Sequence, residues 1–363
     1  MRIVVAMSGG VDSSVVAGLL AEQGHEVIGV TLQLYDHGAA AKRKGACCAG
    51  EDIHDAKRVA DRIGFPHYVI DAEARFRQAV MDDFAASYAA GETPVPCVRC
   101  NQSVKFGDLI AMARDLGAEA MATGHYVRRI EGPGGPELHR AVDPARDQSW
   151  FLFATTRDQL AFSRFPLGDM PDKAAVRAQA ARLGLEVAVK PDSQDICFVP
   201  QGRYTDVIAR LRPEAMAPGD IVDAEGRVLG QHEGIARYTV GQAKRLRLTR
   251  REGEESPVVT QLDPVRRRVV VGPRQGGVHR VQLREVNWLA DAPEDGLRVT
   301  VKLRARAEPA AARVRPLPGG AAEVLLDEAA LPAPGQGCVF YQGDRVMGGG
   351  FIERPVELSA VGT

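Results

Sequence analysis

The sequence has little of what marks membrane proteins and disulfide-rich secreted proteins. Its 363 residues include only six cysteines and 6% aromatic residues, and no apolar run reaches the roughly 20 residues of a membrane-spanning helix. So few cysteines do not make a disulfide scaffold in a chain of this length, so we expect thiols, metal ligands or catalytic groups in a reducing compartment. These absences predict a cytoplasmic globular protein of two or three domains.

Two common nucleotide-binding signatures are also missing. The chain has neither the Gly-Lys-Ser/Thr ending of a Walker loop nor the G-x-G-x-x-G fingerprint of a dinucleotide-binding fold. A phosphate-binding loop in this protein must therefore be of another kind.

A Gly-rich turn near the start of the chain has the character of a phosphate cradle. The apolar run 3–7 leads into Ser8-Gly9-Gly10-Val11-Asp12-Ser13-Ser14, and apolar pairs spaced four residues apart follow. This pattern predicts a strand, a tight turn and a helix. The positive end of the helix would face the turn, where glycine lets the backbone approach an anion. A plain turn with an aspartate cap is the alternative.

The N-terminal half of the chain alternates strands with helices. Further strands are expected at 26–32, 67–70 and 118–123, and helices at 52–64, 75–90 and 104–116. This alternation predicts the α/β class, with a doubly wound parallel sheet whose ligands bind at the carboxyl ends of the strands. The Ser8 turn, Leu32 and Gly124 all fall at that edge. The stretch 132–136 is expected to be a hairpin tip.

Beyond about residue 200 the pattern changes to short strands separated by Gly and Pro turns, which is typical of all-β modules. We therefore expect three domains: a catalytic domain over 1–205, a small central β-rich domain over 206–275 and a C-terminal β-barrel over 276–363.

The net charge of −1 conceals an asymmetry. Between residues 237 and 315 there are 18 Lys and Arg against 9 Asp and Glu, a surplus of +9, so the rest of the chain carries −10. Such a basic region suggests a polyanionic partner. In the run 298–306, basic and apolar residues alternate, which predicts a strand with one buried face and one cationic stripe. A solvated charged surface is the alternative.

Two cysteines lie in a proline-flanked stretch, 93–101, which we expect to be a loop before a helix that begins near Val104. The positive end of that helix and the cation of Arg99 would both lower the pKa of Cys97 and Cys100, and so prepare a nucleophile.

Cys197, in the distant stretch 190–198, is a candidate partner for this pair. Adjacent Cys47 and Cys48 could instead complete a zinc site with the pair, and Cys338 is expected in the core.

Together these features give a resemblance. The Gly-rich turn resembles the pyrophosphate loop (PP-loop) of the ATP pyrophosphatases, and nearly the whole chain is similar to the bacterial tRNA-specific 2-thiouridylases. The matching segments are 6–13, 93–101, 122–126, 147–149, 192–198, 230–234, 239–242, 334–336 and 348–350. The resemblance implies a PP-loop domain of the adenine nucleotide alpha hydrolase type, a central tRNA-binding domain and a C-terminal barrel.

The family also implies the residues of the site. Cys100 would be the nucleophile and Cys197 the persulfide carrier. ATP would contact Ala6, Met7, Ser8, Gly9, Gly10, Val11, Asp12, Ser13, Leu32 and Gly124, with Mg²⁺ held by Asp12 through ATP. Contacts with tRNA would come from His125, Arg146, Asp147, Gln148, Arg304, Ala305 and Gln336.

The implied activity is that of a tRNA-uridine 2-sulfurtransferase. ATP would adenylate the C2 oxygen of the wobble uridine in tRNAs with Lys, Glu or Gln anticodons, and a persulfide would then supply sulfur. The persulfide would come from a cysteine desulfurase or a sulfur-relay protein, and a Cys100–Cys197 disulfide is one way to resolve it. The alternatives are another PP-loop ligase or amidotransferase acting on a small metabolite, and a non-catalytic RNA-binding protein.

The sequence departs from the family pattern at three places. The acidic residue usual three positions before the nucleophile is Cys97, so Cys97, Cys100 and Cys197 could ligate a [4Fe–4S] cluster, although we favour the persulfide. The aromatic often found in the basic strand is Ala305, and Gly-Leu-Gly is replaced by the basic stretch 245–247. The last two departures weaken the assignment of individual tRNA contacts.

Overall fold

The computed structural model describes residues 1–35, 48–191, 196–199, 203–246, 248, 256–274 and 277–354, without the side chains of residues 48 and 49. These residues belong to two compact units. The first comprises Met1–Val80, Cys97–Phe198 and Asp344–Met347, and the second Met81–Pro96, Val199–Gly343 and Gly348–Thr363.

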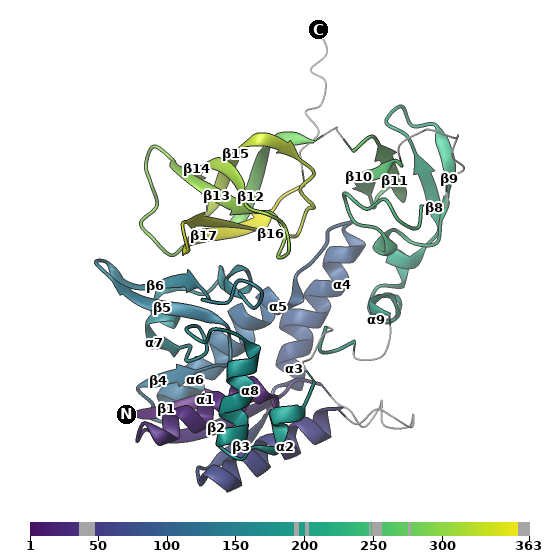
Figure 1. Ribbon diagram of the computed structural model, residues 1–363. Coiled ribbons are helices and arrows are strands. Elements are labelled where there is room, and N and C mark those ends of the chain that lie inside the picture. Colours follow the sequence, from purple (N-terminus) through teal and green to yellow (C-terminus); the bar gives the residue numbers. More distant parts are fainter. Residues whose placement is uncertain are drawn as a thin grey trace. The chain divides into compact units, whose positions relative to one another are not determined.

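A parallel sheet organises the first unit (Figure 1). Its strand order is β3-β2-β1-β4-β7, with bounds β1 Arg2–Ala6, β2 Glu26–Gln33, β3 His67–Asp71, β4 Ala120–Ala122 and β7 Ser163–Arg164. The central strand β1 pairs in parallel with both β2 and β4. The α/β prediction is therefore confirmed, and the turn after β1 lies at the carboxyl edge of the sheet.

Helices cover this sheet. Their bounds are α1 Val11–Glu22, α2 Cys48–Ile63, α3 Glu73–Phe76, α6 Leu109–Asp115, α7 Arg157–Phe162 and α8 Lys173–Arg182, with short 3₁₀ segments η3 Ser149–Leu152 and η4 Glu186–Val189. Helix α1 contacts both α2 and α8, and Val15, Val16 and Ala17 of α1 are fully buried. A helix that is apolar around most of its surface is a core helix, so the first turn of α1 is held firmly behind the Gly-rich turn.

The cysteine-bearing stretch is helical where a loop was predicted. A short helix α5, Pro96–Arg99, runs into a π-helical segment η2, Cys100–Asp108, which continues into α6. The expected helix start near Val104 was therefore wrong. Proline is favoured at the first helical position, because its missing N–H has no partner there and its φ is already helical. The helix predicted over 75–90 is also interrupted, by the π-helical segment η1 Arg77–Met81.

The predicted hairpin is confirmed. Strands β5 Val127–Gly132 and β6 Gly135–Arg140 pair antiparallel, with Gly132 opposite Gly135, so residues 133 and 134 form the tip.

The second unit is mainly β-structure, as predicted (Figure 1). A four-stranded sheet has the order β10-β11-β8-β9, and strands β12-β15-β14-β13-β16-β17 form a barrel closed by pairing of β12 with β17. The strand bounds are β8 Gly219–Val222, β9 Val228–His232, β10 Val258–Asp263, β11 Arg268–Gly272, β12 Val278–Trp288, β13 Leu297–Lys302, β14 Ala310–Leu317, β15 Ala321–Ala330, β16 Gly337–Gln342 and β17 Arg345–Ile352. The first three residues of β17 belong to the first unit. The remaining elements are α4 Asp82–Ala89, α9 Tyr204–Leu211, η5 Pro213–Met216 and η6 Ile235–Arg237.

The basic strand is shorter than predicted. Val299 and Val301 are buried, as expected, but β13 ends at Lys302 and the chain then turns, with the Ala307 N–H bonded to the Arg304 carbonyl. The cationic stripe over 298–306 is therefore not continuous, because the turn breaks the alternation that would have placed its last members on one face.

Among the described residues, no helix is both long enough and apolar enough to cross a membrane. Cys338 lies fully buried in β16, which confirms its expected place in the core.

The packing of the central sheet predicts how much a substitution in β4 lowers the free energy of unfolding. Met121 in β4 is fully buried, so Met121→Ala should lower the free energy of unfolding by about 2–5 kcal/mol through lost burial and the remaining cavity. Leu116→Ala is the control, because Leu116 is 38% exposed, and it should cost less than about 1 kcal/mol. Denaturant titration of both variants measures the difference, and equal losses would contradict the packing described for β4.

Candidate active site

The Gly-rich turn is built around a residue that must be glycine. Gly9 has a φ of +69°, in the left-handed region, and a Cβ there would lie 2.1 Å from the carbonyl oxygen of Asp52 in α2. No side chain fits in that space. The backbone of α2 therefore lies directly against the turn, and Gly10 follows as the capping residue of α1.

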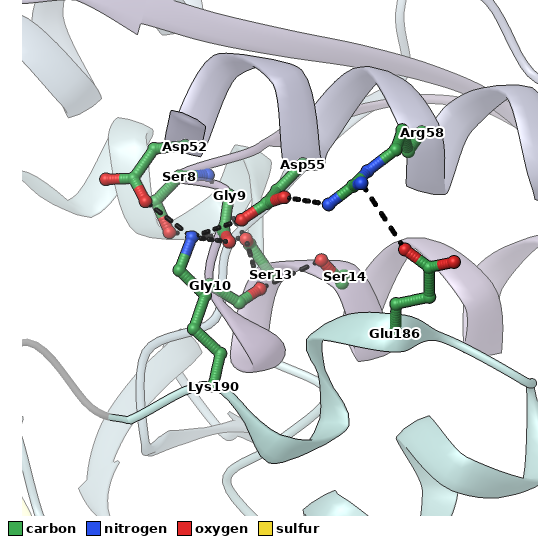
Figure 2. A network of polar contacts seen from close by, with 10 residues as sticks. All are labelled: Ser8, Gly9, Gly10, Ser13, Ser14, Asp52, Asp55, Arg58, Glu186 and Lys190. Atoms are coloured by element: carbon green, nitrogen blue, oxygen red, sulfur yellow. Dashed lines mark hydrogen bonds and ion pairs between the residues drawn. The ribbon is translucent and has the colours of Figure 1, made fainter. Parts of the chain in front are cut away.

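Serine side chains brace the turn from within (Figure 2). The Ser8 N–H donates to Ser13 Oγ at 3.1 Å, and Ser14 Oγ donates to the Gly10 carbonyl at 2.8 Å. Gly124, just beyond β4, approaches from the other strand: a Cβ on Gly124 would lie 2.9 Å from the backbone nitrogen of Ser13. The first-turn N–H groups of α1 have no acceptor within the helix, so the turn can offer them to an anion.

The other residues assigned to ATP are placed as follows. Ala6 ends β1, and Leu32 lies near the carboxyl end of β2, opposite Ile70. Met7 and Val11 are buried in the apolar core, so only their backbone could face a nucleotide. The structure thus brings the predicted loop residues and Gly124 together at one edge of the sheet.

Asp12 is engaged by two residues that the sequence did not suggest. Lys173, the first residue of α8, donates to both carboxylate oxygens of Asp12, at 2.7 and 2.8 Å, and the Tyr126 hydroxyl donates at 2.6 Å. Magnesium carried by a nucleotide usually takes one or two carboxylates from the protein and its other ligands from phosphate and water. One carboxylate beside a phosphate cradle fits such an ion.

A second lysine, Lys190, contacts the backbone of the turn itself (Figure 2). Lys190 Nζ donates to the Gly9 carbonyl at 3.1 Å and to Asp52 at 2.6 Å, and it also binds Asp55. Burial opposes the charge of Lys190, but hydrogen bonds to the two carboxylates raise its pKa above the ordinary value. Lys190 is therefore fully charged at neutral pH. Nothing in the local sequence predicted these contacts, because the partners lie more than 130 residues away.

The structure contradicts the prediction that Cys97 and Cys100 have lowered pKa values. Cys100 is buried, whereas Cys97 and Cys197 reach the surface. Desolvation by the surrounding protein raises the pKa of Cys97 and of Cys100, and the nearby Lys105 only partly opposes it. Desolvation, with repulsion from the charges of Cys100 and Cys97, raises the pKa of Cys197 to about 12. The expected lowered pKa was wrong, because desolvation outweighs the nearby cation of Lys105.

The same repulsion shows that Cys97, Cys100 and Cys197 lie in one neighbourhood. Within the described ranges, however, no group of three or more His, Cys, Asp or Glu side chains is arranged to hold a metal ion. The described residues therefore give the [4Fe–4S] alternative no support. Of the cysteines in the zinc alternative, Cys47 lies outside the described residues, as does the segment 192–195 that precedes Cys197.

Three residues of the first unit that are predicted to contact tRNA, His125, Asp147 and Gln148, form polar contacts within the protein. Thr123 Oγ1 and His125 Nδ1 are 2.8 Å apart, and burial, with the charge of Lys105, lowers the pKa of His125 to about 3, so this imidazole is neutral. Gln148 accepts from the Tyr126 N–H at 3.0 Å. Asp147 accepts from the N–H groups of Ala141 and Ser149 and from the Ser149 hydroxyl. Arg146, beside them, is half-buried.

Two residues of the second unit that are predicted to contact tRNA, Arg304 and Gln336, donate hydrogen bonds to backbone carbonyls. Arg304 donates to the carbonyls of Val240, at 2.7 Å, and Leu331, at 3.4 Å, and burial lowers the pKa of its guanidinium. Gln336 donates to the Thr93 carbonyl at 3.0 Å, and Ala305 is half-buried in the turn after β13. Contact of these residues with tRNA stays a prediction.

Family models match the chain over nearly its whole length. The tRNA methyl transferase HUP domain matches residues 1–201, the tRNA methyl transferase PRC-barrel domain 205–273, and the aminomethyltransferase beta-barrel domain 278–352.

Individual relatives agree with these models. The chain is 68% identical to a tRNA-specific 2-thiouridylase MnmA from Acidiphilium cryptum, over 97% of this chain and 100% of that protein. It is 66% identical to one from Gluconobacter oxydans, over 97% and 99%. Among solved structures, an NMN synthetase from Francisella tularensis matches 58% of this chain and 76% of its own, with 17% identity and a TM-score of 0.33, a likeness too low to carry a conclusion.

The raised pKa of Cys197 predicts how this thiol reacts. Only the thiolate is nucleophilic, so alkylation of Cys197 by iodoacetamide should be slow at neutral pH and should rise roughly tenfold per pH unit up to about pH 10. Unfolded protein is the control, because an ordinary thiol has a pKa near 8.5 and its rate levels off above about pH 9. Peptide mass spectrometry identifies the alkylated residue. A plateau below pH 9 in the folded protein would contradict the raised pKa.

Proposed function

The chain belongs to the family of tRNA-specific 2-thiouridylases, and from this we propose that it converts the wobble uridine of tRNA to 2-thiouridine in an ATP-dependent reaction. Its relatives make it a tRNA-modifying enzyme of the sulfurtransferase type. The observation that best supports the proposed chemistry is the presence, in one compact unit, of the glycine turn at the end of β1 and of Cys100 and Cys197.

The first step activates a poor electrophile. The C2 carbonyl of uracil has no useful leaving group, so its oxygen attacks the α-phosphorus of ATP and pyrophosphate leaves. The N–H groups at the start of α1 and the backbone at Gly9 and Gly10 bind the phosphates and stabilise the charge that develops on them. A magnesium ion bound through ATP would neutralise further phosphate charge, with Asp12 as its protein ligand.

The second step replaces oxygen by sulfur. A cysteine desulfurase or sulfur-relay protein leaves a persulfide on Cys197. The Cys100 thiolate attacks the inner sulfur of this persulfide, which forms a Cys100–Cys197 disulfide and releases hydrosulfide. Hydrosulfide adds at C2 and AMP leaves with the original oxygen. An external thiol then reduces the disulfide. Alternatively, the persulfide sulfur adds at C2 directly, and Cys100 attacks Cys197 to release the thiolated base with the same products.

The electrostatics of the thiols suits this order of events. Because a charge on Cys97 or Cys100 disfavours a charge on Cys197, two thiolates at once are disfavoured. Departure of hydrosulfide and formation of a neutral disulfide remove negative charge from a desolvated neighbourhood. Cys97 is then a spare thiol beside the reaction.

Recognition of tRNA is assigned to both units. The proposed contacts are His125, Arg146, Asp147 and Gln148 of the first unit and Arg304, Ala305 and Gln336 of the second. The wobble base lies in a loop, where a base is turned outward into a site at little energetic cost.

We propose domains at 1–205, 206–275 and 276–363. We expect the enzyme to act in the cytoplasm on tRNAs with Lys, Glu or Gln anticodons.

Nucleoside analysis tests the function. Unmodified tRNA incubated with the protein, ATP, Mg²⁺ and a persulfide donor should yield 2-thiouridine at the wobble position. Cys100→Ser and Cys197→Ser should each abolish the product, because each removes one partner of the sulfur transfer, whereas Cys97→Asp and the core variant Cys338→Ser should retain it if they fold. Product formation by Cys197→Ser would contradict the persulfide assignment, and no product from wild type would contradict the function.

Asp12→Asn tests the nucleotide site. The loss of the carboxylate should lower pyrophosphate release by more than about 100-fold, while tRNA binding stays within about twofold, because Asp12 is assigned to ATP alone. Asp172→Asn is the matched control. Asp172 caps α8 one residue before Lys173 by accepting from the Ala175 N–H at 2.7 Å, and asparagine caps equally well. Normal pyrophosphate release by Asp12→Asn would remove Asp12 from the site.

A further inference from the structure

Lys190 joins three segments of the first unit at the phosphate turn (Figure 2). Its ammonium contacts the Gly9 carbonyl of the turn and the carboxylates of Asp52 and Asp55 in α2. Its own carbonyl accepts from Arg177 of α8 at 2.8 Å. Both ends of the residue are therefore fixed, and the side chain is held on the turn rather than sampling solvent.

The contact with Gly9 fixes the direction of a peptide plane. In a trans peptide the C=O and the following N–H point in opposite directions. A cation that holds the Gly9 carbonyl on one side therefore turns the N–H of Gly10 to the other side. Glycine at both positions allows this peptide to rotate more freely than any other in the turn, so its orientation depends on an external contact.

The same ammonium controls the charge beside the turn. Asp55 is buried, with 5% of its surface exposed, and although burial raises its pKa, hydrogen bonds from Lys190 and Arg58 bring it below the ordinary value. Asp55 is thus a carboxylate at neutral pH. Without Lys190, Asp52 and Asp55 would face the turn with one cation fewer, and their field would oppose a bound polyphosphate.

We propose that Lys190 is a positioning residue for the polyphosphate of ATP: it presets the Gly10 N–H for a phosphate oxygen by holding the Gly9 carbonyl, and it screens Asp52 and Asp55 from the phosphates. This inference rests on the proposed use of ATP. Lys190 contacts the loop, and the loop contacts the nucleotide.

Direct binding measurements test the role without the sulfur chemistry. Calorimetry with ATP–Mg²⁺ and with inorganic pyrophosphate should show that Lys190→Met weakens both by on the order of tenfold or more, the size of a lost hydrogen bond to a charged group. In steady-state assays the KM for ATP should rise while the KM for tRNA stays constant. Lys190→Arg, which keeps a cationic donor, should recover most of the affinity.

Arg58→Met is the matched control. Arg58 binds the same Asp55 carboxylate at 2.6 Å and is largely exposed, with 57% of its side chain accessible. It forms ion pairs with Asp55 and Glu186, neither of which belongs to the turn. It should leave both affinities within about twofold. Equal weakening by Arg58→Met and Lys190→Met would overturn the proposal, because the effect would then be one of general charge. Thermal unfolding of each variant verifies that it is folded.

A double variant separates orientation from charge. Lys190→Met combined with Asp52→Asn removes one carboxylate together with the cation, so it restores the charge but not the contact to Gly9. Affinity that stays low supports the orienting role, and affinity that returns to the wild-type value overturns it. The outcome is independent of thiolation: pyrophosphate binding that depends on Lys190 supports the inference even if no 2-thiouridine is formed, and unaltered binding refutes it even in an active thiolase.

Discussion

The close approach of α2 to the turn after β1 is the constraint on which the site depends. The Asp52 carbonyl occupies the space of a Cβ at residue 9, and Gly9 has a left-handed φ that only glycine takes without strain, so two separate constraints require glycine there. The same close approach brings the acidic residues of α2 beside the turn. Two lysines then balance the charge of the carboxylates, Lys173 beside Asp12 and Lys190 beside Asp52. The anion cradle is thus a product of backbone packing, with charge adjusted around it.

At the cysteines, desolvation has the largest effect on the pKa of the thiols. A thiol at the start of a helix, next to a cation, would ordinarily ionise easily, yet the raised pKa values of Cys100 and Cys197 keep both protonated at neutral pH. A resting thiol in this state resists oxidation and alkylation. In the proposed reaction, the arrival of sulfur on Cys197 makes its inner sulfur an electrophile, which the Cys100 thiolate then attacks.

Much of the fold was predictable because it is encoded locally. The alternation of strands and helices and the two glycines of the turn predicted the parallel sheet and its loop. The single Gly- and Pro-rich stretch 132–136 predicted the hairpin tip, which the structure narrows to residues 133 and 134. The π-helical segment that begins at Cys100 was not predicted, because the spacing of apolar residues in a sequence is compared with the period of an α-helix. Lys173, Tyr126 and Lys190 were missed for a tertiary reason: their bonds to the turn span 114 to 181 residues, and no local pattern records such a pairing. The pKa directions failed for the same reason, because burial is decided by the whole fold.

The π-helical stretch η2 also limits how this chain can change in length. Bonding in a π-helix skips one residue more than in an α-helix, so the segment from Cys100 to Asp108 holds more residues per turn than its neighbours α5 and α6. A return of this segment to α-helical spacing at the same number of residues would change the rotation per residue and turn Cys100 about the axis relative to α6. The direction of the Cys100 thiol toward Cys197 therefore depends on the hydrogen-bond spacing of this stretch as well as on the residues in it.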